Sequence, residues 1–267
     1  GQDREFAQTF VSVRDERTTS RPVLDQFDVP SQAFGLRADY RLPWGGNNHQ
    51  TRLAADLRWA EGETNELFRN LGAGFTRQRR AGGDQFTGGF SLEHGWAVSA
   101  NLTLTGGLRL DRWRNSSGER VERDVSDGQI LLDVDVADQS DWRSSGRIGF
   151  SYDLTPALSV RGSGYTGFRV PTLNELHRPF RVRNDITEAN SDLRPERLRG
   201  LEAGVQYVPL HGVKLDITWF SNWVHDAVAN VTLAQEPGVF PVAGFVPPGG
   251  SLPVSYTHLT LPTSLAV

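Results

Sequence analysis

The segment AFGLRADYRL, residues 33–42, alternates apolar and polar side chains with a period of two. The apolar members, which fall on one face of an extended chain, are Phe34, Leu36, Ala38, Tyr40 and Leu42. The opposite face carries Arg37, Asp39 and Arg41. This alternation is typical of a β-strand with one apolar face and one charged face.

The same alternation recurs along the chain, for example in RLAADLRW from Arg52, NLTLTGGLRLD from Asn101 and VKLDITWF from Val213. It predicts about nine strands, roughly at 3–13, 31–42, 51–60, 85–94, 100–113, 142–153, 158–168, 199–208 and 213–224. Short connections such as LTPA alternate with long ones, near 14–30, 61–84, 114–141, 169–198 and from 225 onward. The chain is therefore predicted to form an antiparallel meander with short turns at one end and long loops at the other.

Two architectures can bury one face of such strands. A soluble barrel or sandwich turns the apolar face to a dry core, whereas a membrane β-barrel turns it to lipid and lines a wet interior with the polar face. Segments of about ten residues match the roughly 9–11 tilted residues that cross a bilayer, and are longer than the ~5–6 of most globular strands. Tryptophans near the strand ends fit an aromatic girdle; they are Trp44, Trp59, Trp96, Trp113, Trp142 and Trp223. We predict an all-β fold, a partial transmembrane antiparallel β-barrel.

Composition sets further bounds. The 267 residues include no Cys, which excludes disulfides and thiolate metal sites, and a net charge of −4 gives no case for nucleic-acid binding. There is no apolar run near the ~18 residues of a membrane helix, and nothing at the N-terminus resembles a signal peptide. The absence of Met and the odd strand number suggest an internal fragment, because bacterial barrels close with even numbers of strands. No enzyme motif is present, so we expect no catalysis.

The segment VSYTHLTLPTS, residues 254–264, does not continue the alternation of the strands and does not resemble a turn. It resembles a translated sequencing-library adapter. We therefore expect residues 1–253 to be the barrel region and 254–267 to be a non-native tail. A Thr/Pro-rich linker is the alternative.

The run GYTGFRVPTLNELHRPF, residues 164–180, marks the end of a strand and the start of a polar loop. It contains a first box, whose key members are Phe168, Arg169, Pro171, Asn174 and Glu175. A second box follows before the next strand, with Asn190, Asp192, Leu193, Pro195 and Glu196. In order and spacing, the two boxes resemble those of the TonB-dependent outer-membrane receptors.

The resemblance implies a barrel of about 22 strands, of which this chain would hold about 9–10, closed by an N-terminal plug domain. The cargo would be a ferric siderophore, haem, cobalamin or a similar scarce solute, and no cofactor other than cargo is expected. Implied partners are the lipid bilayer and lipopolysaccharide of a Gram-negative outer membrane, the plug, and the energising TonB complex, with no nucleic acid. Other classes remain open: a passive porin, a structural outer-membrane barrel, or a soluble β-sandwich binding module.

Physical chemistry explains the corner without the family. Pro171 lacks an N–H group and suits the point where a sheet ladder ends. Arg169 can leave the ladder and pair with an acidic group on the wall or plug. Inward pairs such as Arg37/Asp39 and Arg109/Asp111 would make the interior hydrated and charge-balanced. A structural anchor is the first interpretation of the corner, and direct ligand contact is the second.

Candidate binding residues lie on the long-loop side. The resemblance makes His177 a possible haem-iron ligand, with a packed loop residue as the alternative; otherwise no metal site is expected. His225 is a second possible contact. A basic group in the predicted loop 61–84, formed by Arg77, Arg79 and Arg80, could attract anionic siderophores or lipopolysaccharide phosphates, or could simply be solvated. The acidic stretch 124–141 is expected to be a solvated loop.

Overall fold

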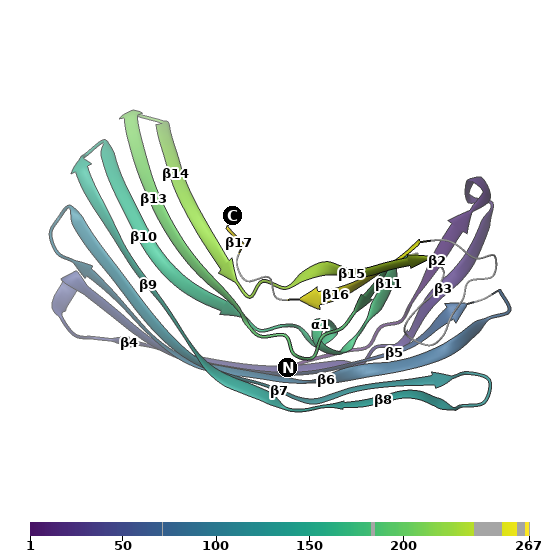
Figure 1. The fold of residues 1–267 in the computed structure, drawn as a ribbon. Coiled ribbons are helices and arrows are strands. Elements are labelled where there is room, and N and C mark those ends of the chain that lie inside the picture. Colours follow the sequence, from purple (N-terminus) through teal and green to yellow (C-terminus); the bar gives the residue numbers. More distant parts are fainter. Residues whose placement is uncertain (71, 183–184, 238–252, 261–264, 267) are drawn as a thin grey trace.

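The computed structural model describes residues 1–70, 72–182, 185–237, 253–260 and 265–266. Long antiparallel strands form one curved sheet (Figure 1). Its main strands, in spatial order, are β4 (Ser31–Leu42), β5 (His49–Asn70), β6 (Phe75–Ala97), β7 (Leu102–Asp124), β9 (Gln139–Thr155), β10 (Leu158–Arg169), β13 (Glu196–Leu210) and β14 (Val213–His225). The order runs from one edge to the other without returning, so the sheet is a partial barrel.

Shorter elements border this sheet. The edges and additions are β1 (Gln2–Arg4), β2 (Gln8–Arg14), β3 (Thr19–Asp28), β8 (Ile130–Val136), β17 (Leu265–Ala266) and the 3-10 turns η1 (Asp15–Arg17) and η2 (Gly46–Asn48). A second sheet contains β11 (Phe180–Val182), β12 (Asp185–Glu188), β15 (Ala229–Pro237) and β16 (Pro253–Thr260). It lies with the single helix of the described residues, α1 (Leu173–His177), on the concave side of the main sheet (Figure 1).

The apolar faces of the long strands point outward and stay exposed. Leu108, Ile148 and Ile217 have exposed fractions of 71%, 72% and 74%. In the described residues, the cluster of buried apolar side chains is small, with Leu176 and Leu193 against the partly buried Val228. A soluble protein would bury such a continuous apolar surface, whereas lipid covers it in a membrane barrel. The predicted fold class is confirmed.

The charged faces line the concave side. Arg109 donates to Asp111 at 2.9 Å and reaches across β6 to Asp56 at 2.6 Å. Gly89 lies between them, and a Cβ there would stand 2.2 Å from an Asp111 carboxylate oxygen. Arg37 donates to Asp39 at 3.0 Å, so both predicted inward pairs are present.

Strand lengths differ from the prediction. The expected loops 61–84 and 114–141 are wrong, because β5, β6 and β7 continue for 22, 23 and 23 residues and β8 pairs with the end of β7. A bilayer needs only about 9–11 tilted residues, so these strands extend well beyond it. The predicted strand 3–13 is divided into β1 and β2, and β3 lies in the expected loop 14–30. The short turns at the other end are confirmed.

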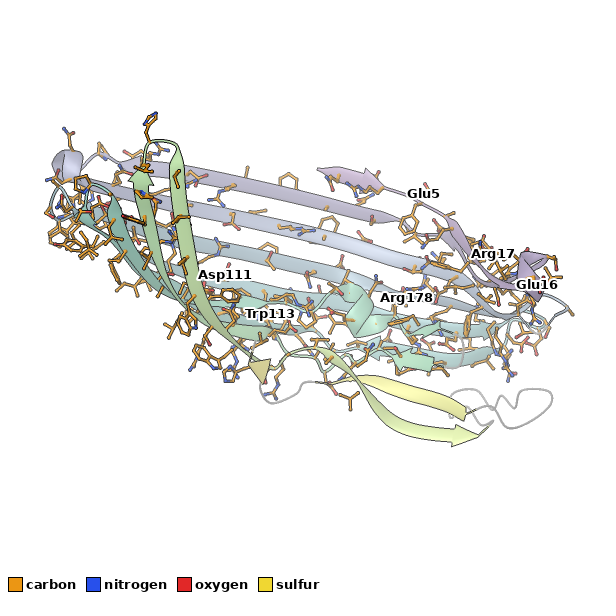
Figure 2. The ribbon with its side chains drawn as sticks, turned by 90° about the horizontal axis from the view of Figure 1, so that it is seen from above. Glu5, Glu16, Arg17, Asp111, Trp113 and Arg178 are labelled. Carbon is orange, nitrogen blue, oxygen red and sulfur yellow. The ribbon has the colours of Figure 1, made fainter. Side chains whose placement is uncertain are left out.

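The tryptophan prediction holds in part. Trp44, Trp96 and Trp142 are exposed at 61%, 41% and 55%. Trp113 is only 4% exposed, because it shares the inward face of β7 with Asp111 (Figure 2). It therefore does not belong to an outer girdle.

The predicted tail begins within β16, which pairs with β15 and, in parallel, with β12. Residues 261–264 and 267 of that tail lie outside the described residues. Its non-native origin stays a prediction. Among the residues that the structure describes, no helix is long and apolar enough to cross a membrane.

The lipid-facing surface gives a depth-dependent prediction. Ile217 lies in the middle of β14, whereas Leu210 lies beside the short turn at Gly212. We expect Ile217→Arg to destabilise the folded barrel by about 2–4 kcal/mol and Leu210→Arg by about 0–1 kcal/mol, because burying a cation costs most at the bilayer midplane. Urea unfolding of the receptor from lipid vesicles measures both. Equal costs would contradict the lipid-facing assignment.

Candidate functional site

The first box forms a corner at which the chain leaves the sheet. Arg169 ends β10, and its guanidinium joins two carboxylates. It donates to both oxygens of Glu175, at 2.9 and 3.2 Å, and to Glu196 at 2.5 Å. Glu175 belongs to the first box and Glu196 to the second. The predicted acidic partner of Arg169 therefore lies in the motif itself, and one side chain ties the two boxes together.

The helix α1 begins directly after this corner. Thr172 and Glu175 form a capping box, in which the Glu175 carboxylate accepts from the Thr172 amide at 2.7 Å. Burial raises the pKa of Glu175, but the hydrogen bonds from Arg169 and Thr172 outweigh it and leave the pKa below its ordinary value. Glu175 therefore stays charged, and it fixes both the helix start and the Arg169 side chain.

The second box folds back onto the first. The amide of Asn190 donates to the Glu175 carbonyl at 3.1 Å, and the Asn190 side chain accepts from the Asp192 amide at 2.9 Å. Leu193 is fully buried and packs with Leu176 of α1. Pro171 and Pro195 are also less than 2% exposed. These contacts support the structural interpretation of the motif; its exposed members are Arg169, Asn174 and Asp192.

His177 packs against the barrel wall. A Cβ at Gly118 would stand 2.5 Å from His177 Cε1, and one at Gly83 would stand 3.4 Å from His177 Nε2. Gly83 lies at a register shift between β6 and β7, and Ser117 has a φ of 54°. This bulge and the two glycines form a hole that we call the His177 socket.

The socket is tight. The imidazole is 4% exposed, and neither ring nitrogen has a hydrogen-bond partner among the described residues. Burial lowers the pKa of His177 to about 4. Because the unfolded pKa is about 6.5, the neutral ring stabilises this packing above pH ~6.5, and the stabilisation is lost as the pH falls towards 4.

A buried group of ion pairs holds the segment after α1. We call it the Arg/Glu cluster; its members are Glu66, Arg79, Arg120, Glu122, Arg178 and Glu188. Glu66, at 0% exposure, accepts from Arg79 at 2.7 Å and from Arg178 at 2.6 Å. Arg79 also donates to Glu122 at 2.9 Å and to the Pro179 carbonyl at 3.0 Å. Arg178 lies over the sheet just beyond α1 (Figure 2).

The cluster is balanced and joins distant segments. Three arginines face three glutamates, and Arg120 pairs with both Glu122 and Glu188. Buried charges persist only when they are paired and hydrogen-bonded. The cluster therefore fixes Arg178 and Glu188 against the outer ends of β5, β6 and β7.

The predicted basic group lies on β6 rather than on a loop. Arg77 pairs with Asp124, Arg79 belongs to the Arg/Glu cluster, and Arg80 pairs with Glu119 at 2.7 Å. Anion binding by these residues thus competes with existing carboxylate partners. His225 ends β14 opposite Arg197, whereas His177 ends α1.

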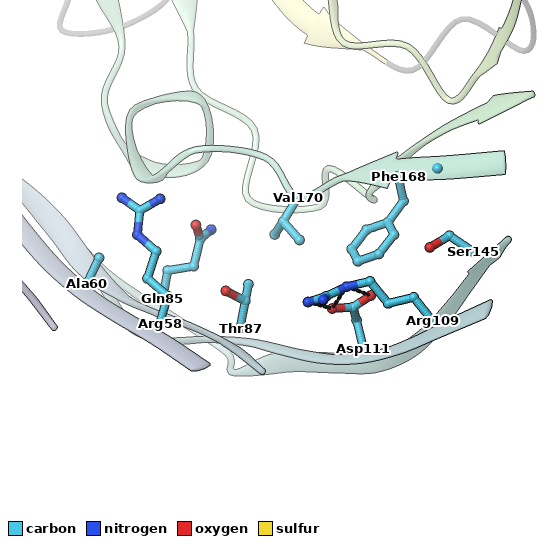
Figure 3. A pocket seen from close by; sticks show the side chains of 10 residues that line it. Arg58, Ala60, Gln85, Thr87, Arg109, Asp111, Ser145, Phe168 and Val170 are labelled. Atoms are coloured by element: carbon cyan, nitrogen blue, oxygen red, sulfur yellow. Dashed lines mark hydrogen bonds and ion pairs between the residues drawn. The ribbon is translucent and has the colours of Figure 1, made fainter. Parts of the chain in front are cut away.

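A cavity of about 420 Å³ lies beneath the corner. Figure 3 shows Phe168 and Val170 over the inner wall, which contributes Arg58, Gln85, Thr87, Arg109 and Asp111. Gln85 donates to the Pro171 carbonyl at 2.9 Å and so ties the corner to the wall. The alternation places Arg58 and Gln85 on the inner face, but it does not reveal which inward residues the corner covers. Within the described residues, no group of three or more His, Asp or Glu is placed to hold a metal ion.

Comparison with known proteins agrees with this geometry. A family model described as "TonB dependent receptor-like, beta-barrel" matches residues 2–252. No match was found among curated proteins.

Solved structures share the fold at low sequence identity. The ferric yersiniabactin uptake receptor FyuA from Yersinia pestis is 15% identical, with a TM-score of 0.60 over 88% of this chain and 34% of that one. The copper transporter OprC is 17% identical, with a TM-score of 0.61 over 90% and 34%. The Serratia marcescens hemophore receptor HasR, solved with its hemophore HasA and heme, is 15% identical, with a TM-score of 0.50 over 92% and 47%. The chain spans about a third of the length of the first two.

The Arg/Glu cluster predicts a sensitive position. Glu66→Gln removes the charge that two buried arginines share, and we expect it to weaken docking of the segment after α1 by about 3 kcal/mol. Glu119→Gln is the matched control, because its partner Arg80 is exposed; we expect a loss of about 0–1 kcal/mol. Hydrogen–deuterium exchange of residues 173–182 measures the docking. Similar exchange in both variants would show that the cluster does not hold the segment.

The His177 socket gives a second prediction. Gly118→Ala places a methyl group 2.5 Å from the imidazole, so we expect faster exchange of the α1 amides. Gly106→Ala, where nothing lies within 4 Å, should leave exchange unchanged. Adding His177→Ala to Gly118→Ala removes the two closest contacts and leaves only Val136 Cβ, at 3.0 Å, so the two changes should be non-additive. Additive effects would place the imidazole outside the socket.

Proposed function

We propose that this chain, which belongs to the TonB-dependent receptor β-barrel family, forms barrel wall of an outer-membrane transport receptor in a Gram-negative bacterium. The receptor captures a scarce nutrient at its outer end. A plug domain then rearranges under the action of the TonB complex and lets the cargo pass. The family consists of transport receptors, so the proposed role is transport rather than catalysis.

The observation that carries this proposal is the docked corner on a two-faced wall. An apolar convex face supports a place in the lipid and lipopolysaccharide of the outer membrane. The inner face carries charge-balanced groups such as Arg109 with Asp56 and Asp111, which suit contact with a polar plug. The first and second boxes fold the chain inward over this face. A cargo entering from the outer end would meet the folded segment and the long strand extensions first.

We propose a metal chelate as the cargo. The solved relatives are named for ferric yersiniabactin, copper and a hemophore with heme. Ferric siderophores, haem and cobalamin all belong to this class. The fold similarity does not select among them, because each relative is less than 25% identical to this chain.

Haem ligation by His177 requires a conformational change. Both ring nitrogens lie in the socket between α1 and the wall, where the cavity measures only about 10 Å³. An iron ligand needs a nitrogen directed at open space. His177 could therefore bind haem only after α1 leaves Gly83 and Gly118.

Energy-dependent uptake tests the function. The receptor that contains this chain should restore accumulation of one radiolabelled chelate in a host without its own receptors, and accumulation should stop when the host lacks TonB. A passive porin would keep transporting without TonB, which would overturn the proposal. If haem is the accepted chelate, His177→Ala should remove its low-spin absorbance; an unchanged spectrum would exclude this ligand.

A further inference from the structure

Two histidines meet at the short-turn end of the sheet, far along the strands from the corner. His49 begins β5 and His94 lies near the end of β6. The Nδ1 atom of His49 lies 3.3 Å from the Nε2 atom of His94. We call these residues the His49–His94 pair.

The pair lies on the lipid-facing side. His49, Thr51 and Leu53 share one face of β5, opposite to Arg52 and Asp56, because side chains alternate along a strand. On β6, His94 shares its face with the exposed Leu92 and Trp96. The pair therefore borders the apolar band at the level of the short turns, where water and headgroups meet the barrel.

Neighbouring side chains orient both rings. Thr51 Oγ1 lies 2.7 Å from Nδ1 of His94, and it accepts a hydrogen bond from the Trp44 indole at 2.9 Å. The ring of His49 stacks on Trp96 at 5.7 Å and on Trp44 at 6.3 Å, measured between centroids. Each imidazole thus has a fixed plane, and the two facing nitrogens converge.

We propose that the His49–His94 pair binds a divalent transition-metal ion through His49 Nδ1 and His94 Nε2. Two ligands about 2.0–2.1 Å from an ion at a tetrahedral angle stand roughly 3.3–3.4 Å apart. The observed separation of 3.3 Å matches that span. Imidazole suits zinc, copper and nickel, and water from the interface completes the coordination.

The hydrogen bonds of the pair fit this role. With a proton on His94 Nδ1 directed at Thr51, the Nε2 lone pair is free to face the ion. When the ion is bound, His49 carries its proton on Nε2 and presents Nδ1. The ion replaces the hydrogen bond between the two facing nitrogens, and the proton of that bond moves to the outer nitrogen of the same ring, so no proton is released. Thr51 is then a positioning residue, because it acts on the ion through His94.

Copper binding tests the site. The receptor in detergent micelles, titrated with Cu²⁺ alone, should take up one tightly bound ion whose electron paramagnetic resonance spectrum shows coupling to two imidazole nitrogens. His49→Asn and His94→Asn should each weaken this binding by tenfold or more. Thr51→Val should weaken affinity by about tenfold while the two-nitrogen signature remains, because outer-shell hydrogen bonds typically contribute about 10–100-fold.

His211→Asn is the matched control, because His211 occupies another short turn, between β13 and β14. It should leave the spectrum and the affinity unchanged. Equal loss in this variant would mean scattered surface binding, and it would overturn the proposal. So would wild-type affinity no higher than that of the double His49/His94 variant. Native mass spectrometry that finds a phospholipid held by the pair, with no metal, would assign the site to a headgroup instead.

Discussion

The structure depends on one constraint: backbone polar groups cannot stay unpaired in hydrocarbon. Each interior strand from β5 to β13 is therefore paired on both sides over most of its length. Once the backbone hydrogen bonds are formed, the alternation along each strand decides which side chains face lipid and which face the interior. Leu108 and Ile148 face lipid, while Arg109 and Arg147 turn to the interior from neighbouring positions. The near absence of an apolar core follows, because the bilayer takes its place.

Where the chain leaves such a sheet, its backbone groups lose their partners in the neighbouring strands, and the corner compensates for this loss. Pro171 has no amide N–H that needs a partner, and the capping box satisfies the amides of Thr172 and Glu175. Arg169 then joins the two carboxylates that flank the excursion, so exit and re-entry of the chain are tied at one point. Farther along, the Arg/Glu cluster also ties the chain to the wall through ion pairs, in this case between buried charges. The inward segment is held by polar contacts at both ends and by the His177 socket between them.

The alternation was enough to predict the sheet, its two faces and its short turns, because a period of two is a local property of the sequence. Strand ends were harder. Beyond the bilayer, segments such as ERVERD, residues 119–124, still pair but no longer need an apolar face. The apolar/polar alternation therefore ends before the strand does. The corner was predicted from Pro171 and Arg169. The partners of Arg79 and His177 were not predicted. Glu66 meets Arg79 only through the register of β5 and β6, and Gly83 and Gly118 lie far from His177 in sequence.

The two ends of the barrel wall are held by different kinds of polar interaction. At the short-turn end, Trp44, Thr51 and the His49–His94 pair form a hydrogen-bonded polar group beside lipid. At the outer end, the Arg/Glu cluster joins four charges on the consecutive strands β5, β6 and β7 to Arg178 and Glu188 of the distant inward segment. Because these arginines and glutamates are already desolvated, each depends on its partner's counter-charge to remain buried. Between the two ends, Asp111 is the counterpart of this cluster: it is 4% exposed, paired with Arg109, and lines the cavity beneath the corner, so buried charge follows the inner wall from the cluster to the corner.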